Sequence, residues 1–166
     1  MQCLHGLKNS AEANMSFKYE IKEQRIQPTA SIRTRTSLSH LPDTIRKSYQ
    51  DISAHLEKTG VICSGAPFAI YYNMDINDID VELGFPLGKD IREKNEIKNS
   101  MIPAGKVLQF THIGPYSELE KTYGDAMKWI KENNISTTGT ICEFYLNDPA
   151  TTPPSDLETE IRFYIK

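Results

Sequence analysis

The chain has 166 residues, of which 39% are hydrophobic and 25% charged, and its formal net charge is −3. This composition is typical of one soluble globular domain, and the acidic balance argues against a nucleic-acid-binding surface. No segment approaches the roughly 18 consecutive apolar residues of a membrane-spanning helix. The three cysteines, Cys3, Cys63 and Cys142, have no CxxC spacing, so neither a disulfide framework nor a zinc site is indicated. We therefore expect a cytoplasmic protein without a metal or cofactor.

The first 18 residues are polar and aperiodic, and we expect them to form a disordered leader ahead of a single domain at 19–166. The segment 19–36 is rich in Ile, Thr and Arg, which predicts a β-strand interrupted near Pro28. It is followed by a predicted helix over Leu41–Thr59, which has a proline in its first turn and a glycine after its last.

Further strands are predicted over 68–72 and 81–87, and the charged segment 88–99 is predicted to be a solvated connector. The second half of the chain repeats this order. It has a predicted strand at 106–112, a helix over Ser117–Asn133 that begins with a capping box, and strands at 141–146 and 157–165.

Identical or similar residues recur at an offset of about 74 positions along the chain. Gly65, Tyr71 and Asn73 recur as Gly139, Tyr145 and Asn147, and Tyr49 and Leu56 recur as Tyr123 and Ile130. The sequence thus predicts two β-α-β-β repeats, at about 19–87 and 104–166, in an α+β fold with a pseudo-two-fold axis. We expect an antiparallel sheet with both helices on one face and a ligand pocket at the repeat junction.

The apolar positions of the helices and of the strand at 141–146 predict the core. The residues expected to be largely buried between helices and sheet are Tyr49, Ile52, Leu56, Tyr123, Met127, Ile130, Phe144 and Leu146.

Alternation along the strands assigns side chains to the two faces of the sheet. The uniformly apolar set that contains Phe144 is assigned to the helix side, which leaves Glu143 and Tyr145 on the opposite face. Tyr71, Glu160 and Tyr164 are assigned to that same open face. A carboxylate among aromatic rings suits a cationic, lipophilic ligand. The alternative is that Glu143 and Glu160 are solvated residues on an exposed strand face, paired with Arg162.

The segments 111–119, 143–149 and 158–161, together with Tyr123 and the pair Trp129-Ile130, resemble the GyrI-like small-molecule-binding family. The same family supplies the effector-binding domains of AraC- and MerR-type transcription regulators. The resemblance covers about residues 20–166 and is most specific in the second half. It implies a pocket at the repeat junction, where an acidic residue at the position of Glu143 meets cationic ligands and Tyr116 forms part of the wall.

We therefore expect a stand-alone protein that binds small cationic, hydrophobic or aromatic molecules, as a drug- or toxin-sequestering protein or as the effector-binding module of a regulator. No helix-turn-helix or basic module is recognised in the sequence, so direct nucleic-acid binding is not expected, and a protein partner is left open. The candidate ligand-binding residues are Glu143, Tyr116, Tyr145, Tyr71, Tyr164, Glu160 and Trp129. For Trp129, packing of the helix is the alternative role.

Two other functions are open at this point. The first is a hydrolase of reactive electrophiles, in which Glu143 deprotonates water and Tyr116 or Tyr145 stabilises the leaving group. The second is inhibition of a protein partner such as DNA gyrase. No catalytic residue is assigned beyond these alternatives.

Overall fold

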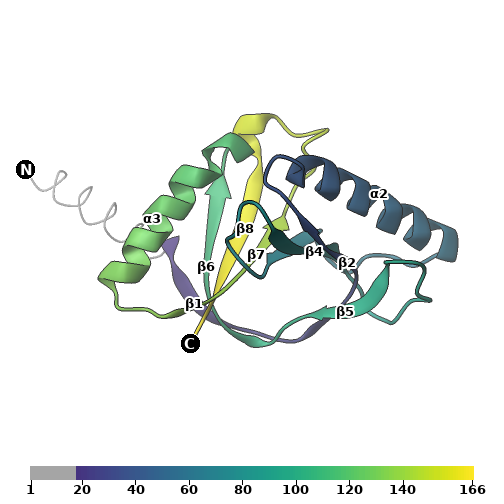
Figure 1. The fold of residues 1–166 in the computed structure, drawn as a ribbon, viewed down its shortest axis with the longest axis horizontal. Helices are drawn as coiled ribbons and strands as arrows, with labels where there is room; N and C mark the ends of the chain where they lie inside the picture. Colours follow the sequence, from purple (N-terminus) through teal and green to yellow (C-terminus); the bar gives the residue numbers. More distant parts are fainter. Residues whose placement is uncertain (1–17) are drawn as a thin grey trace, which may run out of the picture.

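Two long helices pack on the same face of one antiparallel sheet in the computed structural model, which describes residues 18–166 (Figure 1). The predicted leader therefore lies outside the described residues, except for Lys18. The strands are β1 (Glu20–Gln24), β2 (Gln27–Thr36), β3 (Phe68–Tyr71), β4 (Ile79–Pro86), β5 (Lys98–Ile102), β6 (Gly105–Ile113), β7 (Thr137–Tyr145) and β8 (Glu158–Ile165). The helices are α2 (Leu41–Thr59) and α3 (Leu119–Glu132), with short 3₁₀ helices η1 (Tyr116–Glu118) and η2 (Pro154–Asp156).

The strand order shows the internal duplication directly. The sheet reads β1-β6-β8-β7-β3-β4-β2-β5, so β6-β8-β7 of the second repeat mirrors β2-β4-β3 of the first. The offset of 74 residues relates Ala69 to Glu143, and these two residues face each other across the β3–β7 pair. The pseudo-two-fold axis therefore passes between them. The predicted α+β fold of two β-α-β-β repeats is confirmed.

A long two-stranded ribbon joins the two edges of the sheet. Gln24 of β1 faces Gly105 of β6, and Gln27 of β2 faces Ile102 of β5, so the same register runs through both pairs of strands. Only two residues interrupt each side of this ribbon, 25–26 and 103–104. The prediction of a connector up to residue 99 was wrong at its end, because an edge strand such as β5 needs few apolar side chains. The break in the first strand lies at 25–26 and not at Pro28.

The face of the sheet away from the helices is filled and not open. Phe144 of β7 packs there with Ile102 and Val107 of the ribbon and with Tyr164 of β8. The hydroxyl of Tyr164 donates to the carbonyl oxygen of Pro103 at 2.7 Å. This cluster fixes the ribbon against the central strands.

Because both faces of β7 are covered, the predicted assignment of its side chains was reversed. Glu143 pairs with Ile161 of β8, which packs under α3, so Glu143 and Tyr145 lie on the helix face. Phe144 and Cys142 lie on the opposite face. An apolar set identifies a buried face, but it cannot select the helix side when both faces are buried.

Each helix packs on the sheet through one stripe of apolar side chains. Ile52 and Leu56 of α2 pack on β2, and Ala126 and Ile130 of α3 pack on β6 and β8. Helix α2 begins and ends as predicted. Helix α3 begins after η1, and its first residue has no side-chain cap, so the predicted capping box at Ser117 is wrong.

The core prediction holds for Ile52, Leu56, Ile130 and Phe144, which are all less than 9% exposed. Tyr49 and Tyr123 are only half-buried. The prediction was wrong for Met127 and Leu146, whose exposed fractions are 51% and 43%. The inner stripe of α3 runs through Ala126, which turns the adjacent Met127 outward, and Leu146 follows the last residue of β7.

Truncation of the two stripe residues tests this packing. Leu56→Ala and Ile130→Ala should each lower the free energy of unfolding by about 2–5 kcal/mol, because each leaves a cavity under a helix. Met127→Ala should change it by less than about 0.5 kcal/mol, because Met127 is exposed. Urea unfolding of the three variants measures the differences. An equal loss of unfolding free energy in all three variants would contradict the assignment of Leu56 and Ile130 to the buried stripes.

Candidate functional site: a cleft between the two helices

A cleft of about 1560 Å³ opens between α2 and α3, above the strands that meet at the pseudo-two-fold axis. Each helix packs on strands of its own repeat, and the two helices diverge over the central strands (Figure 1). Helix α2 contributes Leu41, Ile45 and Tyr49 to the cleft. On the opposite side, η1 contributes Tyr116, and α3 contributes Leu119 and Tyr123. The floor comes from the sheet and includes Tyr71, Ile79, Phe85, Ile141, Glu143 and Tyr145.

Glu143 is the buried carboxyl group of this cleft. Its side chain is on β7, at the axis, and the residue is only 6% exposed. The hydroxyl of Tyr123 on α3 donates to one carboxylate oxygen, and the hydroxyl of Tyr145 donates to the other at 2.7 Å. Among residues 18–166, the hydrogen-bond partners of this carboxylate are therefore two neutral hydroxyl groups.

The first repeat lacks this arrangement. Ala69 takes the place of Glu143 on the other side of the axis. Tyr49, which corresponds to Tyr123, donates its hydroxyl to the carbonyl oxygen of Phe68 at 2.7 Å. A symmetric fold therefore carries a single carboxylate at its centre.

Burial decides the titration of these groups. Desolvation raises the pKa of Glu143, and the hydrogen bonds from Tyr123 and Tyr145 act in the opposite direction, as does His112. Burial and the charge of Glu143 raise the pKa of Tyr145 and of Tyr123, which keeps both hydroxyls protonated as donors. A charged carboxylate held only by neutral donors is under-compensated, and a cation in the cleft would relieve it.

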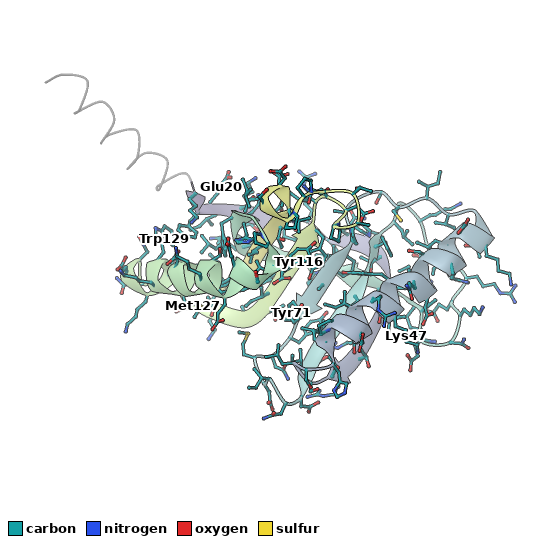
Figure 2. All side chains as sticks on the ribbon, turned by 90° about the horizontal axis from the view of Figure 1, so that it is seen from above. Glu20, Lys47, Tyr71, Tyr116, Met127 and Trp129 are labelled. Carbon is teal, nitrogen blue, oxygen red and sulfur yellow. The ribbon has the colours of Figure 1, made fainter. Side chains whose placement is uncertain are left out.

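Aromatic rings surround the carboxylate. The ring of Tyr145 meets Tyr116 edge-on at a centroid distance of 5.9 Å and Tyr49 at 6.4 Å. Tyr116 is 38% exposed and lies at the mouth. Figure 2 shows Tyr71 and Tyr116 between the two helices, whereas Trp129 and Met127 lie along α3. Four of the residues predicted from the sequence, Glu143, Tyr116, Tyr145 and Tyr71, thus line one cleft.

Three predicted residues lie elsewhere. Tyr164 packs with the ribbon on the far face of the sheet, and Glu160 is held there by the guanidinium of Arg162. Both alternate with the helix-facing residues of β8, so they cannot reach the cleft. Trp129 stacks on Tyr19 at 4.9 Å in the core under α3, which is the packing role given as its alternative.

Two cleft residues were predicted only as core. Tyr49 and Tyr123 occupy equivalent positions on the two helices, and both line the cleft. The signal in the sequence is a tyrosine at the same point of both apolar stripes. A hydroxyl there needs a partner when it is buried, which distinguishes these positions from Ile or Leu.

Within residues 18–166, no group of three or more His, Cys, Asp or Glu side chains is placed to hold a metal ion. None of the helices described here is both long and apolar enough to cross a membrane.

The fold and the cleft define a class, an α+β domain of two β-α-β-β repeats with a cavity at their junction. Within this class the chain belongs to the GyrI-like family, because the profile of the GyrI-like small molecule binding domain matches residues 17–166. A comparison with curated protein sequences gives no match.

Solved structures share this fold. The C-terminal domain of EcmrR has a TM-score of 0.78 and 22% identity, over 89% of this chain and 96% of that one. SAV2435 bound to tetraphenylphosphonium has a TM-score of 0.68 and 11% identity, over 89% and 93%. A hydrolase from Listeria innocua has a TM-score of 0.64 and 13% identity, over 93% and 98%. The match to EcmrR in its complex with DNA covers 63% of the length of the EcmrR chain. At these identities the likeness shows the fold alone.

The raised pKa of Glu143 predicts a specific dependence of stability on pH. Because the folded protein binds this proton more tightly than the unfolded chain, the contribution of Glu143 to the free energy of unfolding falls as pH rises from the unfolded to the folded pKa. Above the folded pKa the charged carboxylate destabilises the ligand-free protein by a constant amount.

Glu143→Gln should therefore raise the Tm at pH 7.5, by about 2–4 °C for each kcal/mol gained. The difference from the unsubstituted protein should shrink as the pH is lowered towards the ordinary glutamate range of about 4.3. Thermal unfolding of both proteins at a series of pH values measures this. A variant that is less stable at pH 7.5 would show that the carboxylate is not under-compensated.

Proposed function

We propose that this protein binds small cations with hydrophobic or aromatic surfaces in the cleft, with Glu143 as the counter-charge. The observation that carries this proposal is a buried carboxylate, at the floor of a large cleft, whose hydrogen-bond partners are both neutral. A cation that reaches Glu143 gains a strong interaction in a desolvated environment and replaces the water that the carboxylate has lost.

The shape of the cleft supports the same class of ligand. Its volume exceeds that of the usual pocket for a drug-sized molecule, about 300–1,000 Å³, so it accommodates bulky ligands. The rings of Tyr71, Tyr116 and Tyr145 offer faces and edges for stacking and for cation–π contacts. Because the tyrosine hydroxyls already donate to both oxygens of Glu143, the ligand does not need its own N–H donor. Delocalised and quaternary cations are suitable.

The relatives support this proposal by analogy. SAV2435 was solved with tetraphenylphosphonium, a hydrophobic cation without hydrogen-bond donors. EcmrR carries a domain of this fold in a protein that binds DNA. We infer a role for this chain in the cytoplasm, either as a protein that sequesters drugs or toxins or as the effector-binding part of a regulatory system.

Substitution of the carboxylate tests the proposal. Glu143→Gln removes one partner of a desolvated charge pair, which typically costs about 3–5 kcal/mol, or about two to four decades of affinity. Binding of tetraphenylphosphonium, measured by isothermal titration calorimetry, should weaken by about this factor. Binding of an uncharged tetraphenyl analogue should change little.

Glu82→Gln is the matched control. Glu82 is also buried and accepts hydrogen bonds from two hydroxyls, those of Ser31 and Tyr72, but it lies on the far face of the sheet. Its substitution should leave both affinities within about twofold. Equal losses in the two variants, or full affinity in Glu143→Gln, would contradict the role of Glu143.

Hydrolysis is the second candidate, because a neighbour of this fold is described as a hydrolase and Glu143 combines a raised pKa with two tyrosine donors. The same variant separates the two functions. A hydrolase that uses Glu143 as general base would lose turnover of an uncharged electrophile in Glu143→Gln. We expect a product assay with an epoxide or another strained ring to give no turnover above background in either protein.

A further inference from the structure

His112 is a buried histidine that the cleft itself does not use. It lies on β6, is 5% exposed, and does not line the cleft. Both of its ring nitrogens have partners. Nε2 is 3.1 Å from the carbonyl oxygen of Pro115, and Nδ1 is 2.6 Å from the hydroxyl oxygen of Thr122. A carbonyl oxygen only accepts, so Nε2 carries the proton, and in the neutral ring Nδ1 accepts from Thr122.

The two partners directly precede the two tyrosines that surround Glu143 from the α3 side. Pro115 is followed by Tyr116, which packs edge-on against Tyr145. Thr122 is followed by Tyr123, which donates to the carboxylate of Glu143. The imidazole of His112 therefore links β6 to two segments. One is the loop that precedes Tyr116, and the other is the turn of α3 that carries Tyr123.

The loop is built closely around this ring. Gly114 has a φ of +134°, where other residues are strained, and its backbone N–H donates to the carbonyl oxygen of Leu157 at 2.8 Å. A Cβ on Gly114 would lie 3.1 Å from Oε2 of Glu118 and 3.7 Å from Nε2 of His112. A side chain at position 114 would therefore lie against the imidazole.

The first repeat lacks both the histidine and the carboxylate. Along the sheet, the row Tyr145–Thr159–His112 of the second repeat corresponds to the row Tyr71–Val81–Thr34 of the first. Thr34 replaces His112 in the repeat where Ala69 replaces Glu143. The two polar groups thus occur together in one repeat, on one face of the sheet.

The imidazole also acts electrostatically on Glu143. A positive charge on His112 lowers the pKa of Glu143, against the larger effect of burial. On its other side His112 borders a small polar depression whose titratable groups are Lys18, Glu118, Lys121 and Asp125. The imidazole therefore lies beside a set of charged groups, in the row of the sheet that includes Tyr145.

We propose that His112 is a positioning residue for ligand binding, which holds Tyr116 and Tyr123 in place around Glu143. This inference rests on the proposed function, since it concerns the affinity of the same cleft. Loss of the imidazole should weaken cation binding although every group that lines the cleft is retained.

Three substitutions separate the two hydrogen bonds. In His112→Gln the terminal amide nitrogen can donate to the carbonyl oxygen of Pro115, in His112→Asn the shorter amide can bond to Thr122, and His112→Leu keeps neither bond. Since one net hydrogen bond is worth about a fivefold to tenfold change in an equilibrium constant, the affinity for tetraphenylphosphonium should fall by about that factor in the amide variants. It should fall further in His112→Leu.

The control is His55→Gln, which removes another buried histidine, hydrogen-bonded from α2 to the carbonyl oxygen of Arg92 at 2.6 Å. It should leave the affinity within about twofold at a temperature where all variants are folded. The affinity should be higher in His112→Gln and His112→Asn than in His112→Leu. A purely structural loss would not produce this partial recovery.

A double-mutant cycle tests whether His112 acts through Tyr123. Tyr123→Phe should weaken binding strongly in the unsubstituted protein and much less in His112→Leu, because the hydroxyl is already misplaced there. Additive effects, or unchanged affinity in folded His112→Leu, would overturn the inference.

A ligand-free measurement keeps the inference separate from the proposed function. The pKa of Glu143, followed by ¹³C NMR of its carboxyl carbon, should rise in His112→Leu, because the placement of Tyr123 and the electrostatic effect of the imidazole on Glu143 are both lost. An unchanged pKa would also overturn the inference. If the unsubstituted protein binds no tetraphenylphosphonium, the proposed function fails, and this titration still decides the role of His112.

Discussion

The carboxylate of Glu143, buried at the pseudo-two-fold axis and held by two tyrosine hydroxyls, is the constraint on which the rest of the structure depends. Such a group is stable only when its donors are placed accurately, because each lost hydrogen bond leaves a desolvated charge. The donors come from α3 and from β7 itself, so helix and strand must be fixed relative to each other. Under α3 the core of Ala126, Ile130 and Ile161 supplies this rigidity.

The ribbon explains how a charge comes to lie so deep. Strands β1–β2 and β5–β6 run as one antiparallel pair from edge to edge and cover the face of the sheet away from the helices. Phe144 and Cys142 then bury the reverse side of β7 on both sides of Glu143. Glu143 is therefore desolvated from beneath as well as from the sides, and only the cleft gives it access to a counter-charge.

Duplication supplies the shape of the site, and divergence between the repeats supplies its chemistry. Two equivalent helices diverge about the axis and create the cleft, and Tyr49 and Tyr123 line it from equivalent positions. The polar groups, by contrast, are concentrated in the second repeat, where Glu143 and His112 replace Ala69 and Thr34. A cleft with one buried carboxylate has one desolvated place for a positive charge and apolar walls for the remainder of the ligand.

By itself the sequence determined the two repeats and the bounds of α2, because periodicity, turn residues and a recurring offset can be read along the chain. The expectation that Glu143 and Tyr116 share a pocket came from the resemblance to a family. Only the tertiary structure decided which face of β7 carries Glu143, since both faces of that strand are apolar enough to be buried. It also decided that Tyr123 and not Tyr164 contacts the carboxylate. That choice depends on strand register and helix placement, which are set by contacts between residues far apart in the sequence.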